Sequence, residues 1–340
     1  MTDSVAAPLT KGRMAATLLV LAVATIAIAV VAIAFGSVHI SLAQAVVDAA
    51  SPDRAILIGV RLPRILMGAI VGAVLAGVGV ALQALVRNPL AEGGILGISG
   101  GGAFGAILAM VLFSRLAATD TIVPAAAFVA ALASTWAVYR LAQLQGRLEP
   151  FTLLLVGVIF NAFWGAAIML VNSIVNFYFT HSILFWLMGS LEAPTYREVL
   201  MVMLCGLAGF TVLIARARDM NLMSLGDDEA AELGVEVDAT RRMIFVATSV
   251  MIGAAVAVSG IISFVGLIVP HILRTVIGPD HRLLIPASIL GGAAFTIAAD
   301  LVARTVIAPS ELPVGAITAL CGGPFFIYVL RRAGRKSFAL

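Results

Sequence analysis

The sequence carries little charge. Asp, Glu, Lys and Arg together make up 11% of the 340 residues, whereas about a quarter is usual in a soluble globular domain. Hydrophobic residues make up 61%, and the mean hydropathy is +1.11. A water-soluble globule of this length could not bury so many apolar side chains. The composition therefore excludes a soluble enzyme and indicates a protein embedded in a lipid bilayer.

Side chains that usually carry chemistry are also scarce. The two cysteines, Cys205 and Cys321, lie far apart in apolar runs and form no CxxC pair, so we interpret them as small hydrophobic residues. The four histidines show no H-x-x-x-H spacing, and we expect no metal site. Both lysines lie near the chain ends, so the sequence contains no P-loop for ATP. A net charge of +3 gives no reason to expect nucleic acid as a partner.

Long apolar runs, by contrast, occupy most of the chain. A membrane-crossing helix needs about 20 mostly apolar residues, and nine runs of that kind are present. A tenth run, 264–277, is shorter and contains Pro270; we predict a short or broken crossing inside the bundle. The sequence thus predicts one all-α, polytopic membrane domain over residues 1–340 with about ten crossings. The nine longer runs are 14–36, 62–85, 94–114, 121–143, 151–171, 198–215, 243–262, 283–303 and 313–330.

The basic residues predict the orientation of the chain. Ten crossings place both termini on one side of the membrane. If that side is cytoplasmic, 15 of the 21 Lys and Arg residues lie there and 6 lie outside. The positive-inside rule therefore predicts that both termini are cytoplasmic. Residues 1–13 then form a cytoplasmic tail, and residues 216–242 form the longest cytoplasmic loop.

The glycine-rich stretch 95–105 resembles two functional motifs. Residues 100–105 have the G-x-G-x-x-G spacing of a dinucleotide-binding loop, but no strand precedes them, as that fold requires. Ser99 lies in a G-x-S-G sequence typical of intramembrane serine proteases, which also need a histidine within reach. His181 and His271 are the candidates, and nothing in the sequence links either of them to Ser99. An intramembrane serine protease stays an alternative function.

A different spacing explains these glycines better. Gly93, Gly97, Gly101 and Gly105 recur every four residues and are followed by Ala109. In a helix they would share one face, and small residues on a face allow a second helix to approach closely. We therefore predict that the four glycines serve helix packing.

Acidic residues are almost absent from the predicted crossings. Asp300 is the exception, and it lies four residues before Arg304, a spacing that suits an ion pair on one helix face. We interpret Asp300 as a structural partner of Arg304. An ion-coupled secondary transporter, which usually places ionisable groups at mid-membrane, stays an alternative function.

The polar segment 216–242 is predicted to contain a short helix. Asp227 follows Ser224 at the spacing of a capping box, acidic residues suit a helix N-terminus, and Gly234 suits a C-terminal cap. One interpretation is a plain connecting loop, and the other is a helix that docks onto a cytosolic partner. On the outside, Arg61 and Arg64 could anchor a helix at the interface or form an electropositive rim for an acidic partner.

Several segments together resemble the FecCD-type permeases, the membrane subunits of ABC importers for iron-siderophores, haem and vitamin B12. The resemblance extends over about residues 57–332 and rests on five segments in the same order. They are RLPRILMGAIVGAVLAGVGVALQALVRNPLAEGGILGISGGGAFG (61–105), FWLMGSL (185–191), LGDDEAAELGV (225–235), SGIISFVGLIVPHILR (259–274) and ADLVARTVIAPSELPVGAITALCGGPFFIYVL (299–330).

The resemblance implies a set of partners. Two permease subunits, either two copies or this chain with a close homologue, would form a central pathway in the bacterial cytoplasmic (inner) membrane. Two cytosolic ABC ATPase subunits would dock underneath, and a periplasmic or lipid-anchored binding protein would deliver the cargo. ATP and magnesium would belong to the ATPase, so this chain would be no enzyme and would hold no cofactor. Ferric siderophores are the expected cargo, with haem and cobalamin as alternatives.

The resemblance also implies roles for individual residues. Arg61, Arg64 and Arg304 would pair with acidic residues of the binding protein. The gate residues would be Asn88, Pro89 and Leu90 in one loop, and Glu149 and Pro150 in a second loop whose sequence, RLEPFT, departs from the family pattern. The coupling helix that enters the ATPase would comprise Leu225, Gly226, Asp227, Asp228, Glu229, Ala230, Ala231, Glu232, Leu233 and Gly234.

Overall fold

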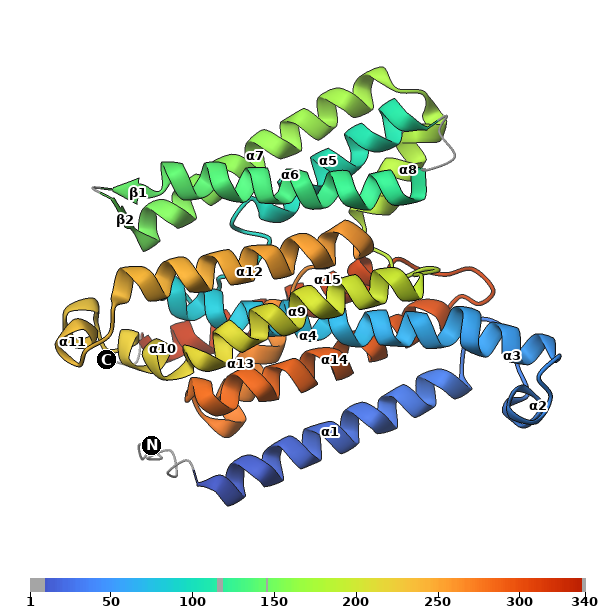
Figure 1. The fold of residues 1–340 in the computed structure, drawn as a ribbon, viewed down its shortest axis with the longest axis horizontal. Helices are drawn as coiled ribbons and strands as arrows, with labels where there is room; N and C mark the ends of the chain where they lie inside the picture. The colour runs from blue at the N-terminus through green and yellow to red at the C-terminus, as the bar shows by residue number, and fades with distance from the viewer. Residues whose placement is uncertain (1–9, 115–118, 145, 338–340) are drawn as a thin grey trace.

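The computed structural model describes residues 10–114, 119–144 and 146–337. Most of these residues form helices that run roughly along one axis (Figure 1). The strands in this part of the chain are β1 (Gln143–Leu144) and β2 (Arg147–Leu148), which form a short antiparallel hairpin. The predicted all-α class is confirmed. The cytoplasmic tail predicted for residues 1–13 lies largely outside the described residues.

Seven helices are long and apolar enough to cross a membrane, and three shorter apolar helices coincide with the other three predicted crossings. The total of ten crossings stays a prediction. The helices are α1 (Lys11–Ala34), α2 (Leu42–Val47), α3 (Pro52–Ile56), a π-helical turn (Leu57–Arg61), α4 (Leu62–Leu85), α5 (Ile98–Phe113), α6 (Thr119–Leu141), α7 (Pro150–Ile174), α8 (Phe177–Leu187), α9 (Tyr196–Ala215), α10 (Ala217–Met223), α11 (Asp227–Glu232), α12 (Val237–Ser259), α13 (Val265–Ile277), α14 (His281–Thr305) and α15 (Val314–Ser337).

The bundle has two distinct ends. We call the end that carries α10, α11 and the β hairpin the terminal end, because α1 begins and α15 finishes there (Figure 1). The other end, which we call the opposite end, carries α2, α3 and the start of α4. Arg13 at the start of α1 donates to the carbonyl of Ile277 at 3.1 Å, whereas Ala32 near its end accepts from Arg304 at 2.6 Å. Helix α1 thus runs from the terminal end to the opposite end, and Figure 1 shows both ends of the described chain at the terminal end. That this end is cytoplasmic stays a prediction.

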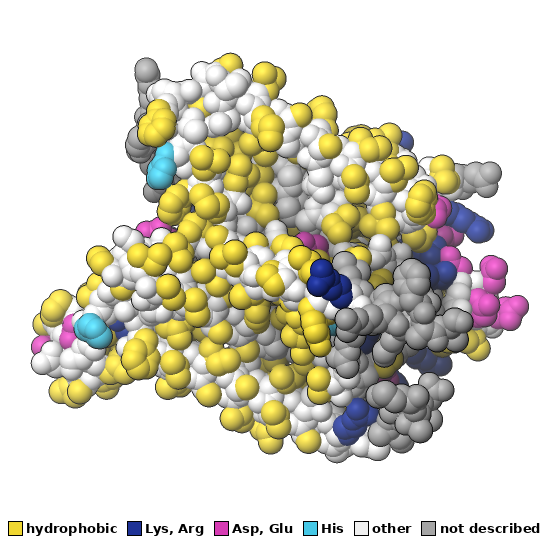
Figure 2. All heavy atoms as spheres, turned by 180° about the vertical axis from the view of Figure 1, so that it is seen from behind, with side chains coloured by type: hydrophobic (Ala, Val, Ile, Leu, Met, Phe, Trp, Pro, Cys, Tyr) yellow, Lys and Arg dark blue, Asp and Glu magenta, His cyan; other side chains and the backbone are white. Residues whose placement is uncertain are grey.

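Burial differs sharply among the crossing helices. In the most apolar part of the Pro52–Leu85 span, 78% of the residues are buried, and in α12 72% are buried. The corresponding shares are 6% in α1 and 11% in α7. The helices α4, α12 and α14 therefore form the core, while α1 and α7 present apolar side chains outward. Figure 2 shows the resulting surface, with hydrophobic side chains over the middle and charged ones gathered at the terminal end.

Small residues allow the core helices to approach closely. On α4, Gly72 lies so near the backbone of Gly292 and the side chain of Thr296, both on α14, that a Cβ at this position would overlap with them. Close approach increases the number of van der Waals contacts between two helices, which is a main source of helix association in a membrane.

The glycine spacing predicted one continuous helical face, and this prediction is wrong for its first half. Helix α5 begins only at Ile98, so Gly93 and Gly97 precede it, and Gly97 has a φ of +75°, which favours glycine. Gly101 and Gly105 do lie on α5, and a Cβ at either position would overlap with Ser134 or Ala130 of α6. A Cβ at Gly93 would likewise overlap with Ile252 of α12, and one at Gly97 with Phe160 of α7, so all four glycines lie at close contacts although only two lie on a helix.

Candidate functional site: the coupling segment, the gate loops and the arginine cluster

The segment 216–242 forms two short helices, α10 and α11, between α9 and α12. Gly226 is the residue that directly precedes helix α11, and its φ is +151°. No side chain caps the start of this helix. The predicted capping box is wrong, because the Ser224 hydroxyl instead donates to the carbonyl of Asn221 at 2.6 Å. The predicted C-terminal cap is confirmed: Gly234 has a φ of +85°, and the next amide, of Val235, bonds back to α11.

Helix α11 is fixed to the rest of the protein through one carboxylate and one small apolar residue. Asp227 accepts two 2.7 Å hydrogen bonds from the Arg241 guanidinium of α12 and forms an ion pair with Arg87. Ala230 is fully buried in a small cluster with Met223 and Val235. The inner face of α11 is therefore held by ionic contacts at Asp227 and by apolar packing at Ala230.

The outer face of α11 is free of such contacts among the described residues. Leu225 and Leu233, which flank α11 at its two ends, are 65% and 58% exposed, although large apolar side chains usually avoid water. Asp228, Glu229 and Glu232 are exposed beside them. Two apolar side chains among three carboxylates form a small amphipathic surface that a partner protein could cover.

The first predicted gate loop is joined to this segment. The Asn88 side chain accepts a hydrogen bond from the amide of Leu90 at 2.9 Å, which shapes the turn around Pro89. Arg87 directly precedes this turn and carries the ion pair to Asp227. A movement of α11 would thus pull on the turn at residues 88–90.

The second predicted gate loop is joined to the same segment. Glu149 accepts hydrogen bonds from the amides of Phe151 and Thr152, with Pro150 as the first residue of α7. Burial acts to raise the pKa of Glu149, but these hydrogen bonds and the charge of Arg241 outweigh it, so the pKa lies below its usual range. Beside it, Arg147 of the hairpin pairs with Asp238 at 3.3 Å.

The three arginines expected at a docking surface lie inside the opposite end. Arg61, Arg64 and Arg304 are only 4%, 6% and 3% exposed. Arg64 donates to Asp300 at 2.9–3.1 Å and to Glu311 at 2.6 Å. The docking role stays a prediction, and it would require these side chains to leave partners within their own chain.

The other two arginines of this cluster complete it. Arg304 lies 3.4 Å from Asp300, so the predicted structural pair is confirmed, and its guanidinium also donates to the carbonyl of Ala32. Arg61 donates to the carbonyls of Ile33 and Ala34 in the last turn of α1 and to that of Val38 just beyond it. The cluster therefore ties α1, α4 and α14 together.

Sequence reasoning did not single out Glu92. Its carboxylate accepts a 3.0 Å hydrogen bond from the amide of Phe264, which directly precedes α13 and has a φ of +69°. Glu92 thus connects the loop before α5 with the start of α13. The available signal was simple, since Glu92 is the one acidic residue between positions 62 and 114.

The described residues form neither a serine-protease site nor an ion-coupling site. Ser99 is buried at the start of α5. His181 packs on Phe185, and His271 packs edge-on against Phe325; within the described residues neither histidine bonds to Ser99. Nor does Asp300 fit an ion-coupling site, because it is already paired with two arginines.

Comparison with known proteins identifies the family of this chain. A profile of the FecCD transport family matches residues 19–332. The chain belongs to the FecCD transport family. The FecCD chain is 45% identical over 274 residues to a cobalamin import system permease protein of Halobacterium salinarum, covering 80% of this chain and 72% of the relative. It is 39% identical over 287 residues to a hemin transport system permease protein of Yersinia pestis, covering 82% and 83%.

A solved structure agrees with the FecCD assignment. The solved structure is an inward-facing conformation of a transporter described as a metal-chelate type ABC transporter. One of its chains superposes on this chain with a TM-score of 0.82 at 30% identity. The match covers 94% of this chain and 99% of that chain. The FecCD chain is thus a multi-pass membrane permease of the ABC transporter class, and its helices are the membrane-spanning part of such a transporter.

Proposed function

We propose that this chain works as a dimer, with a second copy or a close homologue, and forms the pathway through which an ABC importer moves a metal chelate. We further propose a ferric siderophore as the cargo, with haem and cobalamin as the alternatives. Relatives at similar identity bear names for different chelates: cobalamin at 45%, hemin at 39% and iron(3+)-hydroxamate at 37%. What these compounds share is a metal held in a large organic ligand.

The observation that carries the proposal is the way α11 is held. Its inner face is bound through Asp227 to Arg87, which precedes the 88–90 turn, and to Arg241 of α12. The residues that flank it, Leu225 and Leu233, are exposed. A partner that binds the outer face differently in two states would shift the populations of those states, and the inner contacts would pass the movement to the gate loop.

In this proposal the partner is a pair of cytosolic ATPase subunits, which bind ATP and magnesium, while this chain holds no cofactor. The terminal end then faces the cytoplasm, as the excess of basic residues predicts, and the protein lies in the bacterial cytoplasmic membrane. Ten crossings are part of the same proposal. The short helices α5 and α13 then begin inside the bundle, where neighbouring helices shield the preceding irregular backbone.

The test of coupling is charge reversal on the outer face of α11. The chain is co-expressed with the ATPase encoded beside it, and co-purification and ATP hydrolysis in lipid vesicles are measured. Asp228→Lys with Glu229→Lys should abolish co-purification, because both carboxylates are exposed beside the apolar pair. The matched control is Asp48→Lys with Glu192→Lys, which changes the charge equally at the opposite end. Unchanged ATPase binding in the α11 variant would disprove the docking role.

The pathway is proposed to run beside α7. This helix of 25 residues contains no Asp, Glu, Lys or Arg, and most of its surface is not covered by the chain itself. A wall without fixed charge would hold a large cargo weakly and release it readily. Uptake of a radiolabelled ferric hydroxamate, haem and cobalamin into vesicles that contain the full transporter identifies the cargo, and transport of one of the latter two alone would replace the siderophore assignment.

A binding protein is proposed to deliver the cargo to the opposite end. Arg61 is the most informative residue for a test, because no described carboxylate forms an ion pair with it, so a neutral replacement leaves no buried acid unpaired. If the arginines dock the binding protein, Arg61→Gln should weaken its affinity more than Arg197→Gln, which removes an exposed charge. The reverse order would move the docking surface to the exposed residues.

A further inference from the structure

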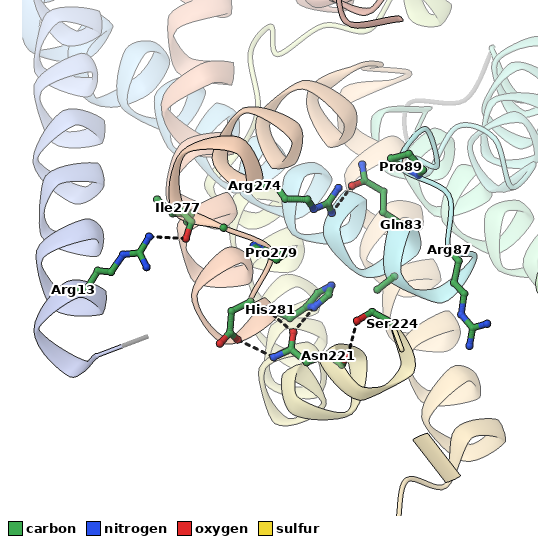
Figure 3. Close-up of a pocket in the computed structure, with 13 residues that line it drawn as sticks. Arg13, Gln83, Arg87, Pro89, Asn221, Ser224, Arg274, Ile277, Pro279 and His281 are labelled. Carbon is green, nitrogen blue, oxygen red and sulfur yellow. Dashed lines mark hydrogen bonds between the residues drawn. The ribbon is translucent and has the colours of Figure 1, made fainter. Parts of the chain in front are cut away.

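A cavity of about 560 Å³ lies at the terminal end, beside Arg87 and Pro89 of the first gate loop (Figure 3). Its walls come from segments that are far apart in the sequence. Arg13 of α1 and Arg274 of α13 face it, as do Gln83 and Arg87 at the end of α4 and Asn221 of α10. The cavity therefore lies where the ends of several crossing helices meet.

The charged side chains around the cavity are mostly positive. Among the described residues that line it, three are arginines, Arg13, Arg87 and Arg274, and one is an acid, Asp280. The acid is already bound to Arg282, outside the lining, at 2.6 Å, and Arg87 is paired with Asp227. In the part of the chain that the structure describes, no carboxylate forms an ion pair with Arg274.

Arg274 is held in place by a neutral side chain. The Gln83 side chain is only 4% exposed, and its amide nitrogen donates to the carbonyl of Gly266 at 3.2 Å. This bond fixes the orientation of the amide, so its oxygen faces Arg274 and accepts a 2.8 Å hydrogen bond (Figure 3). A guanidinium has five N–H donors, and this contact uses one of them. The planar group is therefore positioned before any ligand arrives.

A second wall of the cavity is formed by α10. The Asn221 side chain accepts from the backbone amide of His281 at 2.9 Å and donates to Asp280 at 2.8 Å, so this wall is fixed by its own hydrogen bonds. Across from it, Arg13 donates to the carbonyl of Ile277 at the end of α13 (Figure 3). A ligand here would contact α1, α10 and α13 together.

The surroundings point to a lipid as the source of the ligand. Helix α1, which forms one wall, is the least buried of the seven long crossings. A second cavity of about 480 Å³ adjoins the first at His281 and is lined by Lys11, Met14 and Arg282. Basic cavities between crossing helices on the cytoplasmic side are suited to anionic lipid headgroups.

We propose that the Arg13–Arg274 cavity binds the phosphate group of an anionic phospholipid of the cytoplasmic leaflet. The Arg274 fork donates to two phosphate oxygens, a geometry that an arginine fits better than a lysine. Arg13 adds positive charge from the side of α1. A bound headgroup then links the peripheral helix α1 to α13 and to the coupling segment.

The test measures which lipid stays bound to the purified full-length chain. The protein is reconstituted with equal parts of phosphatidylglycerol and phosphatidylcholine, extracted with mild detergent and analysed by native mass spectrometry. Phosphatidylglycerol should be retained over phosphatidylcholine, and Arg274→Gln should reduce that preference about tenfold, the effect of losing one strong charge-assisted contact. Arg274→Lys should fall between the two. The matched control, Arg242→Gln, removes an exposed arginine of α12 at the same end and should retain the preference.

Three outcomes would overturn the proposal. The first is an equal preference in the native chain and in Arg274→Gln. The second is an equal loss in Arg242→Gln, which would show a general effect of charge. The third is a rise in unfolding temperature with inorganic phosphate in the absence of any lipid preference, which would make the ligand a soluble phosphate compound. If Arg274→Gln does not fold, Arg13→Gln replaces it with the same expected loss of preference.

Discussion

The two ends of the molecule use the same pair of residue types in opposite ways. At the opposite end, Arg64 and Asp300 are joined with side chains only 7% and 3% exposed. At the terminal end, Arg87 and Asp227 are joined with side chains 41% and 39% exposed. A buried pair cannot separate without leaving a charge away from water, whereas an exposed pair can separate into water at little cost.

We infer from this difference that the two ends resist rearrangement unequally. The buried cluster holds α1, α4 and α14 together and resists rearrangement. The exposed pair connects α11 to the 88–90 turn and can be remade in another geometry. The chain thus has a fixed end and an adjustable end, and each of the following changes tests that contrast.

The largest effect is expected for Arg64→Ala. It leaves Asp300 buried without its main partner, and breaking a buried ion pair in this way costs about 3–5 kcal/mol. Unfolding in detergent, followed by circular dichroism, measures the loss. Arg197→Ala, an exposed charge at the same end, should change stability by less than about 0.5 kcal/mol.

A double variant sharpens this first prediction. Arg64→Met with Asp300→Leu removes both charges and replaces them with apolar groups, which is often neutral or stabilising for a buried pair. It should recover most of the stability lost in Arg64→Ala. A double variant as unstable as the single one would mean that the arginine acts through Glu311 or through packing, and not through its pair with Asp300.

A smaller effect is expected for Asp227→Ala at the terminal end. It removes the carboxylate from Arg241, which is 5% exposed, while Arg87 remains in contact with water. The Arg241 guanidinium is then left buried without its charge partner, and because the Asp227 side chain is itself 39% exposed, the loss should lie at the lower end of about 3–5 kcal/mol. The same unfolding measurement applies, and a loss as large as that of Arg64→Ala would show that the terminal end is no more adjustable than the opposite end.

Much of this contrast could not be predicted from the sequence. The apolar runs predicted the crossings, and the i,i+4 spacing predicted the pair of Asp300 with Arg304, because both are local patterns. The contact of Arg64 with Asp300 spans 236 positions, and that of Arg87 with Asp227 spans 140. Contacts of this kind depend on how helices pack, so Arg61 and Arg64 looked like surface residues and Arg87 was overlooked.

Arg87→Ala separates stability from coupling. Arg87 is exposed, so losing its pair should cost only about 0.2–1 kcal/mol, because Asp227 keeps its bonds to Arg241. In vesicles with the ATPase, however, hydrolysis should continue while uptake falls, because the link to the 88–90 turn is broken. The control is Arg242→Ala, another exposed arginine at the terminal end, and uptake reduced equally in both variants would remove the proposed link.

The smallest effect is expected from acid at Asp280, which caps the start of α14. Hydrogen bonds from the Arg282 side chain are the main cause that lowers its pKa to about 2, against an opposing effect of burial. Because the folded pKa lies below the unfolded value of about 3.9, the stabilisation is complete above pH 4 and is lost as the pH falls toward 2. The pair of Asp280 with Arg282 is largely in contact with water, so its stabilisation should lie at the lower end of about 0.2–1 kcal/mol.

Asp280→Asn keeps a capping side chain but cannot titrate, so unfolding midpoints measured between pH 5 and pH 2 should fall less steeply in this variant than in the native chain. Identical slopes would show that Asp280 contributes only its cap, and that the adjustable end gains no stability from this charge.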